Sequence, residues 1–312
     1  MDRFQAMEVF ARVVELGGFT KTADSLRLPK ATVTTLVQAL EAHLQVRLLN
    51  RTTRHVSVTP DGAAYYQRAI RILEELREVE SLVTNATATP RGRLRIDVLA
   101  AVGRLVIAPA LPHFFQKYPH IALEMGCTDR PVDLLEEGVD CVIRGGELFD
   151  DTLVARRIGE MKLVTCAAPD YLAKNGTPTT PTELAHHLFV NYFSSRNGKV
   201  FDFDFTNDGE KRAVAGRHLV AVNDGDAATA AGLAGLGVLQ VPTFMVQHHL
   251  SSGRLRVILG EWLAEGLPLY VMYPQNRHLT AKVRVFVDWV TELFAESDLM
   301  QVRSTWPPKP NK

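Results

Sequence analysis

Cysteine is scarce in this chain. Its 312 residues include only Cys127, Cys141 and Cys166, and none stands in a Cys-x-x-Cys pair. The three lie in apolar stretches, so we expect buried thiols in a reducing cytosol. A thiol-based redox regulator that uses one of them is kept as an alternative function.

Motifs of catalysis are absent. The sequence has no Gly-x-Ser-x-Gly, His-Glu-x-x-His, P-loop or Gly-x-Gly-x-x-Gly. The adjacent pairs at 186–187 and 248–249 would point to different sides of a helix, so we expect surface histidines. We therefore expect no enzyme, no metal site and no cofactor. A metabolic enzyme with an N-terminal helical domain is the less favoured alternative.

A signal peptide and a membrane span are also absent. The N-terminus carries Asp2, Arg3 and Glu8 among apolar residues, so we expect a cytoplasmic protein with no membrane partner rather than an exported solute-binding protein. Residues 227–246 are uncharged, but their glycines and proline favour a buried helix, turn and strand.

Net charge is absent as well, because 35 Lys and Arg balance 35 Asp and Glu. With 46% hydrophobic and 22% charged residues, the chain is an ordinary soluble protein long enough for two or three domains. Its charge is uneven, however. Residues 17–60 contain six basic and only two acidic residues, which form a local basic patch.

The patch contains two short amphipathic segments in residues 19–41, which we interpret as a helix-turn-helix. Thr20 is expected to cap the first helix, and Pro29 is expected to open the second. The 4, 3, 4 spacing of Val33, Val37, Leu40 and Leu44 predicts one buried stripe along the second helix. The outer face of the second helix is polar and uncharged, which suits a DNA major groove, although any solvated helix face can look alike. The residues expected to contact DNA are Thr20, Lys21, Lys30, Ala31, Thr32, Thr34, Thr35 and Gln38.

Residues 48–59 predict a two-stranded hairpin, the wing of a winged helix. Its turn carries Arg51, Thr52, Thr53 and Arg54, whose guanidinium groups suit phosphates or a narrow minor groove.

A long helix follows the wing, with Thr59 as its cap and Pro60 at its first position. Its apolar residues recur at coiled-coil spacing, so we expect a homodimer or homotetramer. Packing of this stripe on its own domain is the alternative. The stripe consists of Tyr65, Ala69, Ile72, Leu76, Val79 and Val83.

Four motifs stand in order in this region: AxxLxL at 23–28, VTTLVQALE at 33–41, LLNRTTR at 48–54 and TPDG at 59–62. Through them, residues 1 to about 90 resemble the DNA-binding region and linker helix of LysR-type transcriptional regulators. The family usually has Ser where Pro29 stands, so a side-chain cap is lost there.

From Arg93 onward, strands alternate with helices, which predicts an α/β sheet with ligand sites at the strand ends. The expected strands are 94–98, 121–125, 139–143, 162–168, 188–192, 201–205, 218–222 and 269–273. One helix is expected to end near Tyr118, a second to lie near 132–137 and a third to span about 280–295. Two lobes should therefore be joined by crossings near 159–161 and 266–268.

The resemblance to the family continues through GRLRI at Gly92, the run from Pro109 to Pro119, PDYL at Pro169, VNDGDA at Val222 and GRL at Gly253. It implies a periplasmic-binding-protein-like effector domain with a small-molecule cleft between its lobes.

We expect the effector to lie at the strand ends that face this cleft. Free N–H groups at the following helix starts attract anions, so a carboxylate is the expected effector. Arg144 would add a cation, although a structural ion pair is an equally good interpretation of it. The expected effector-binding residues are Ala100, Ala101, Val102, Gly103, Thr128, Arg144, Ala168, Tyr192, Ser194, Asn223, Asp224, Asp226, Pro242 and Thr243.

The expected fold class is thus an α+β winged helix-turn-helix (1–59), a linker helix for dimerisation (60–89), a two-lobed α/β effector domain (90–300) and a C-terminal tail (301–312). The lobes are expected at about 92–161 with 268–300, and at 162–267. The resemblance implies a regulator that binds an interrupted inverted repeat in double-stranded promoter DNA under the control of a small-molecule effector. RNA polymerase stays open as a further partner.

Overall fold

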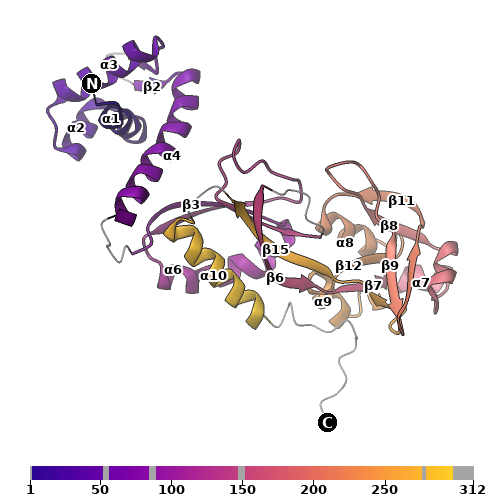
Figure 1. Cartoon of the computed structure of the whole chain (residues 1–312). Coiled ribbons are helices and arrows are strands. Elements are labelled where there is room, and N and C mark those ends of the chain that lie inside the picture. Colours follow the sequence, from indigo (N-terminus) through magenta and orange to yellow (C-terminus); the bar gives the residue numbers. More distant parts are fainter. Residues whose placement is uncertain (1, 52–55, 84–88, 147–151, 276–278, 298–312) are drawn as a thin grey trace. The chain divides into compact units, whose positions relative to one another are not determined.

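The computed structural model describes residues 2–51, 56–83, 89–146, 152–275 and 279–297 (Figure 1). The chain divides into two compact units, Met1–Ala88 and Thr89–Lys312. Each unit has its own hydrophobic core, so each is described by itself.

The first unit is a helical domain with a small hairpin. Its elements are α1 (Arg3–Leu16), α2 (Phe19–Leu26), α3 (Lys30–Leu44), β1 (Leu49–Arg51), β2 (Val56–Val58) and α4 (Pro60–Val83). The predicted apolar stripe of α3 is confirmed, because Val33, Val37 and Leu40 are buried in the core of this unit. Strands β1 and β2 pair antiparallel, which is the pairing expected of a wing.

The helix ends differ from the prediction in two places. Helix α2 begins at Phe19 and has no side-chain cap, so the predicted cap by Thr20 is wrong and this residue lies in the first turn. Pro29 lies at the N-cap of α3, one position before the helix. The predicted cap of α4 is confirmed, because the Thr59 hydroxyl accepts a hydrogen bond of 2.9 Å from the Gly62 N–H.

The second unit begins with a five-stranded sheet of order β4-β3-β5-β15-β6, which forms the first lobe with its helices. Strand β3 pairs parallel with β4 and β5, whereas β15 pairs antiparallel with β5 and β6. The elements are β3 (Gly92–Val98), α5 (Ala100–Val102), a π-helical segment (Gly103–Ile107), α6 (Ala108–Lys117), β4 (Ile121–Cys127), β5 (Cys141–Gly145), β6 (Leu153–Met161), β15 (Leu267–Pro274) and α10 (Ala281–Glu296).

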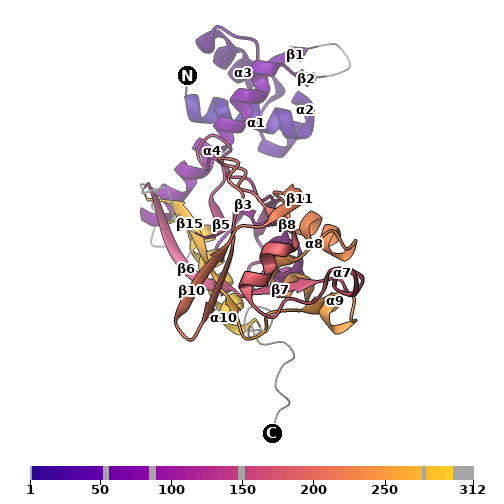
Figure 2. The same ribbon diagram turned by 90° about the vertical axis from the view of Figure 1, so that its right-hand side faces the viewer.

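Helices α6 and α10 supply much of the core of the first lobe, and α10 packs beside β6 (Figure 2). The Phe114 ring of α6 lies 4.9 Å from the Trp289 ring of α10, between ring centroids. The prediction of a helix near 132–137 is wrong, because this segment forms turns. Asp133 accepts hydrogen bonds from two backbone N–H groups here, and Gly138 has a positive φ of 65°.

The second lobe contains three small sheets, of order β10-β9-β14, β11-β8 and β12-β7-β13. Strand β9 begins two residues later than predicted. The elements are β7 (Leu163–Ala167), α7 (Pro169–Asn175), a 3-10 helix (Pro181–His186), β8 (Leu188–Tyr192), β9 (Phe203–Asn207), β10 (Glu210–Val214), β11 (Arg217–Val222), α8 (Gly225–Leu233), β12 (Leu239–Pro242), α9 (Thr243–Ser251), β13 (Arg256–Val257) and β14 (Leu263–Ala264).

The uncharged stretch 227–246 is a helix, a turn and a strand, as predicted, followed by the start of α9. In the part of the chain that the structure describes, no helix has the length and apolar character to cross a membrane. The chain passes from β6 to β7 at Lys162 and returns at residues 265–266. Both positions lie beside the predicted crossings between the two lobes.

Candidate nucleic-acid interface and effector site

The outward face of α3 presents the residues predicted to read bases. Ala31, Thr35 and Gln38 are exposed, and Thr34 is half-buried. The Thr34 hydroxyl donates to the Lys30 carbonyl at 3.0 Å, and the Thr35 hydroxyl donates to the Ala31 carbonyl at 2.9 Å. Both hydroxyl protons are thus engaged within the helix. The threonines then offer methyl groups and lone pairs, while Gln38 keeps a free donor and acceptor on its amide.

The remaining predicted DNA contacts lie on α2, at the start of α3 and on the wing. Thr20 and Lys21 are exposed in the first turn of α2, and Lys30 is exposed at the first residue of α3. Thr32 is half-buried. Arg51 is the last residue of β1. The other wing residues, Thr52, Thr53 and Arg54, lie outside the described residues.

The apolar stripe of α4 begins inside the first unit. The Tyr65 ring meets the Phe10 ring edge-on at 5.7 Å between centroids, and Ala69 is only 1% exposed. Burial raises the pKa of Tyr65. Further along, Ile72 is 41% exposed and Leu76 is half-buried. The first part of the stripe therefore packs on its own domain, and only its later part leaves apolar surface; the side chains of Val79 and Val83 lie outside the described ones.

In the second unit, a carboxylate joins the two lobes. The Asp129 carboxylate accepts a hydrogen bond of 2.9 Å from the Ala100 N–H and lies 3.3 Å from the Tyr192 hydroxyl. That hydroxyl also lies 3.0 Å from the Asn223 carbonyl, so its single proton is shared between the two acceptors. Burial raises the pKa of Tyr192, and the Asp129 charge raises it further. Three of the predicted effector residues are thus gathered around Asp129.

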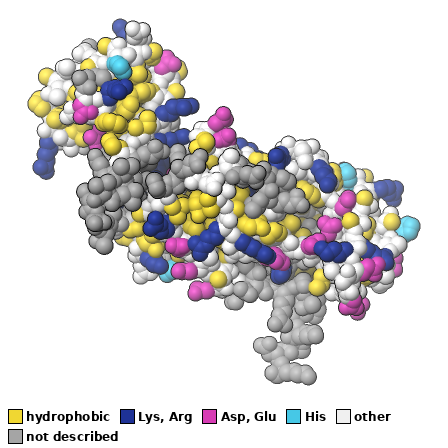
Figure 3. All heavy atoms as spheres, viewed as in Figure 1, with side chains coloured by type: hydrophobic (Ala, Val, Ile, Leu, Met, Phe, Trp, Pro, Cys, Tyr) yellow, Lys and Arg dark blue, Asp and Glu magenta, His cyan; other side chains and the backbone are white. Residues whose placement is uncertain are grey.

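A second contact between the lobes is an ion pair. Arg104, from the π-helical segment of the first lobe, pairs through both terminal nitrogens with Asp226 of α8. The neighbouring Asp224 caps α8 by accepting a hydrogen bond of 2.7 Å from the Ala227 N–H. On the face of this unit that Figure 3 shows, Lys and Arg side chains are interspersed with Asp and Glu side chains.

Arg144 lies within β5 and forms an ion pair with Asp97 of β3. The side chains are 15% and 9% exposed, respectively. Arg144 also donates to the Arg130 carbonyl at 3.2 Å. Burial raises the pKa of Asp97, and the hydrogen bond from Arg144 lowers it. The ion pair that the sequence left open is therefore present, and a contact between Arg144 and a ligand stays a prediction.

Several other predicted effector residues are packed into the protein. Ala101 and Val102 belong to the core of the first lobe, and Ala168 belongs to that of the second. A Cβ on Gly103 would lie 2.7 Å from the Cys127 sulfur, so close packing requires glycine there. Thr243 is 2% exposed and donates to the Lys162 carbonyl.

The other three lie nearer the surface. Thr128, Ser194 and Pro242 are half-buried. The Thr128 N–H donates to the Val98 carbonyl at 3.0 Å, and the Thr128 hydroxyl accepts a hydrogen bond from the Arg130 N–H. Their part in binding stays a prediction.

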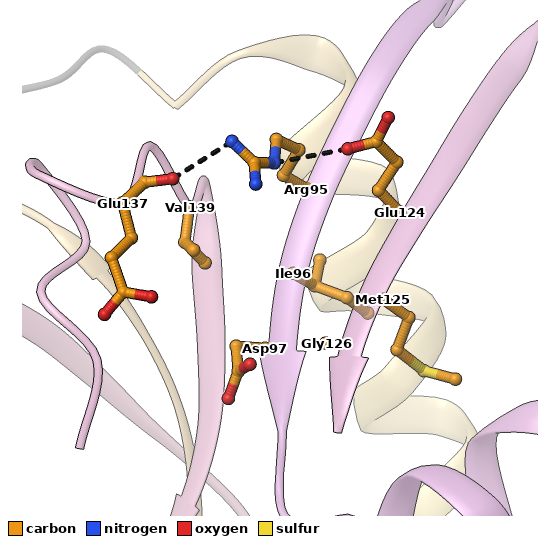
Figure 4. A pocket seen from close by; sticks show the side chains of 8 residues that line it. All are labelled: Arg95, Ile96, Asp97, Glu124, Met125, Gly126, Glu137 and Val139. Atoms are coloured by element: carbon orange, nitrogen blue, oxygen red, sulfur yellow. Dashed lines mark hydrogen bonds and ion pairs between the residues drawn. The ribbon is translucent and has the colours of Figure 1, made fainter. Parts of the chain in front are cut away.

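A pocket of about 300 Å³ lies on the first lobe (Figure 4). The Arg95 guanidinium in it donates to the Glu137 carbonyl at 3.0 Å and lies 3.2 Å from the Glu124 carboxylate. The Glu137 carboxylate pairs with Arg130 and the Asp97 carboxylate with Arg144, so each acidic group of the pocket already has a cationic partner. None of the predicted effector residues lines the pocket. The lining residues are Arg95, Ile96, Asp97, Glu124, Met125, Gly126, Glu137 and Val139.

Two expectations about reactive side chains need correction. Cys141 and Cys166 are buried as predicted, but Cys127 is exposed. Burial raises the pKa of Cys166 to about 12. Partial desolvation of the Cys127 thiol and the nearby Asp97 charge raise the pKa of Cys127 as well. Little thiolate forms on either at neutral pH, which weighs against a redox switch.

His187 is 5% exposed rather than a surface residue, because it is enclosed beside Tyr171. Burial lowers the pKa of His187. Its ring nitrogen Nδ1 lies 3.3 Å from the Tyr171 hydroxyl, so the histidine belongs to the packing of the second lobe. Among the described residues, no group of His, Cys, Asp and Glu side chains could hold a metal ion.

Sequence reasoning missed Asp129 and Arg104, which make the contacts between the lobes. Each directly follows a predicted effector residue, Thr128 or Gly103. Asp129 follows the end of β4, where a ligand-facing loop was expected, so its position was a usable signal. Arg104 had no comparable signal, because its partner Asp226 is 122 residues away in the sequence.

Two family models match the chain. Residues 4–63 match the model described as "Bacterial regulatory helix-turn-helix protein, lysR family". Residues 87–295 match the model described as "LysR substrate binding domain". Together the two matches cover most of the chain.

Individual relatives and solved structures agree with these models. The HTH-type transcriptional repressor PA14_22550 of Pseudomonas aeruginosa is 41% identical over 302 residues, which are 97% of this chain and 95% of the relative. The HTH-type transcriptional activator AaeR of Escherichia coli is 33% identical, with 95% of each chain covered. The structure of CrgA, a LysR-type transcriptional regulator from Neisseria meningitidis, has a TM-score of 0.57 and 31% identity, and covers 92% of this chain and 97% of that one. The full-length structure of the Vibrio cholerae virulence activator AphB has a TM-score of 0.56 and 30% identity, with 92% and 98% covered.

Proposed function

Because the chain belongs to the LysR family of bacterial transcriptional regulators, we propose that it binds an interrupted inverted repeat in promoter DNA and that a carboxylate effector changes this binding. The protein is a DNA-binding regulator with an effector-binding domain, and its relatives are regulators rather than enzymes. One relative is named a repressor and another an activator. The relatives thus include both directions of control.

The exposed face of α3 is the observation that carries the DNA-binding proposal. It is polar, its first residue is the exposed Lys30, and its Gln38 amide is free to bond adenine. The wing arginines Arg51 and Arg54 are proposed to contact phosphates. We assign residues 1–59 to the DNA-binding domain, 60–89 to the linker helix, 90–300 to the effector domain and 301–312 to the tail.

The oligomer follows from the later part of α4. Ile72 and Leu76 leave apolar surface there, at coiled-coil spacing. A two-fold dimer would place its two α3 helices in successive major grooves, which is why a palindromic site is proposed. A homodimer or homotetramer in the cytoplasm, in contact with RNA polymerase at the promoter, completes the proposal.

Gln38→Ala and Thr34→Ala test the base contacts. A preferred site is first selected from random duplexes with the wild-type protein. Each substitution should then cost about 1 to 3 kcal/mol on that site and relax the preference at one base position. Gln67→Ala, on the exposed face of α4, is the matched control and should leave the affinity for the site and the base preference unchanged. An unaltered preference in Gln38→Ala would refute the assignment.

A thermal-shift screen of the full chain tests the effector. A ligand that binds only the native state raises its melting temperature, so small carboxylates and aromatic acids are compared with their amides. A rise with acids alone supports the proposed class. A rise with amides or amines alone contradicts it.

A further inference from the structure

The two lobes are joined through a carboxylate that belongs to the chain itself. Asp129, in the loop after β4, accepts from the Ala100 N–H of its own lobe at 2.9 Å. Its other oxygen lies 3.3 Å from the hydroxyl of Tyr192, at the end of β8 in the other lobe. The same hydroxyl lies 3.0 Å from the Asn223 carbonyl, so its single proton is shared between that oxygen and Asp129. The Ala100 N–H and this hydroxyl thus converge on Asp129 from the two lobes. This is the pattern that an effector bound between two lobes would need.

We propose that Asp129 occupies the position of the effector's carboxylate in the ligand-free protein and has to be displaced when the effector binds. The inference rests on the proposed effector function and deepens it. It assigns Ala100 and Tyr192 as the pair of donors that hold the effector's acidic group. It also makes Asp129 the residue that sets how strongly an effector must bind.

The chemistry of the two donors supports this assignment. A hydrogen bond to an ionised acceptor is about twice as strong as one between neutral groups. Two carboxylates cannot share the same donors, because like charges at hydrogen-bond distance repel each other. The contact with Asp129 and the binding of an acidic effector are therefore mutually exclusive.

Tethering explains why a bare carboxylate should not displace Asp129 from the wild-type protein. A group held on the same chain acts at an effective concentration on the order of millimolar or above. A small free acid has no other contacts with which to compete. An effector must therefore gain affinity from the rest of its structure, and Asp129 excludes acids that lack such contacts.

Removal of the Asp129 contact should leave the lobes connected. The ion pair between Arg104 and Asp226 joins them independently. The sheet pairing of β15 with β6, next to both crossings, is also unaffected. An Asp129→Ala variant should therefore fold and expose the two donors.

Acetate is the probe for the vacated position in Asp129→Ala, measured on the full chain by thermal unfolding. At ten times its Kd, acetate should increase the native population relative to the unfolded one about eleven-fold. For a unit of this size that corresponds to a melting temperature higher by roughly 3 to 6 °C. The wild-type protein should show no such saturable rise. Acetamide, which has the same shape without the charge, should act more weakly, and sodium chloride at equal ionic strength should not reproduce the effect.

Two further variants separate this position from a general effect of the acid. Asp133→Ala removes a different carboxylate of the same lobe, one that accepts hydrogen bonds from two backbone N–H groups, and acetate should not stabilise this variant. Tyr192→Phe added to Asp129→Ala removes one donor and should abolish most of the acetate response. Asp129→Asn keeps an acceptor for the Ala100 N–H and so protects the fold. It should show a smaller acetate response than Asp129→Ala.

The proposal is overturned if acetate stabilises neither Asp129→Ala nor Asp129→Asn. It is also overturned if wild type, Asp133→Ala and Asp129→Ala respond equally, or if the response survives Tyr192→Phe. None of these measurements involves DNA. A failure here leaves promoter binding intact, whereas a failure of the proposed function would appear as lost site selection by the wild-type chain.

Discussion

Replacing one partner of the ion pair between Asp97 and Arg144 should destabilise the second unit strongly. The side chains are 9% and 15% exposed, so solvent screens the pair only weakly. Arg144→Met leaves the Asp97 carboxylate buried without its cation, and Asp97→Ala leaves the guanidinium with carbonyl partners alone. Either change should cost about 3 to 5 kcal/mol, because a buried charge loses its partner.

Calorimetry on the full chain measures this effect. For a unit of about this size, 3 to 5 kcal/mol lowers the melting temperature by roughly 6 to 20 °C. The double variant Asp97→Ala/Arg144→Met removes both charges and should recover much of the loss. Arg156→Met is the control, since its ion pair with Asp288 joins side chains 45% and 55% exposed. Its loss should cost below about 1 kcal/mol.

The outcome decides between the two interpretations of Arg144. If Arg144→Met has the melting temperature of the wild-type protein and changes only the response to an effector, the guanidinium is a ligand contact and the stability argument is refuted. If it unfolds early and the double variant does not, the ion pair is structural. A loss that the double variant does not recover would point to Arg144 packing rather than to charge.

Three other predictions concern DNA, assembly and pH. Arg51→Ala and Arg54→Ala should each weaken specific and non-specific DNA binding alike and reduce the slope of log K against log salt by about 0.9, measured by salt titration; a loss confined to the specific site would make them base readers. Leu76→Lys should shift the chain toward monomers on a sizing column, because it places charge in the proposed seam, and a retained oligomer would move the interface to the effector domain. The hydrogen bond from Lys162 lowers the pKa of Glu160, so its stabilisation is present above the ordinary glutamate pKa near 4.3 and is lost as the pH falls below it. Because Arg157 also pairs with Glu160, Lys162→Met should reduce this acid sensitivity without removing it, by below about 1 kcal/mol at such exposure. An unchanged slope of stability between pH 6 and 3 would contradict this.

Local periodicity predicted most of the elements. The 4, 3 spacing of Val33, Val37 and Leu40 placed the buried face of α3 correctly, because each turn of a helix repeats the same geometry. Helix ends were harder to predict, since they depend on backbone contacts that have no period. The sequence predicts Thr20 as a cap, whereas Gly18 holds that position. The apolar residues near Asp133 fall at helix-like intervals, yet the segment forms turns held by the Asp133 carboxylate.

Pairs that are distant in the sequence could not be predicted from it. Arg144 meets Asp97 across 47 residues, and Arg104 meets Asp226 across 122. Neither partner carries a local signal of the other, so the sequence could only offer Arg144 two roles. Burial of His187 was missed for the same reason, because Tyr171 and the strand beside it enclose it. The sequence predicted the loops of the effector site, but the contacts of Asp129 with Ala100 and Tyr192 are visible only in the fold.

The order of strands in the first lobe has a consequence for synthesis. Strand β15 lies between β5 and β6 and pairs with both, yet it is made about a hundred residues after β6 ends. While the ribosome produces the second lobe, β5 and β6 each wait with an unpaired edge, and α10 has not yet emerged to cover the apolar face. The first lobe to be translated is therefore the last to be completed, and a nascent chain stopped before Leu267 should depend on chaperones more than the finished protein does.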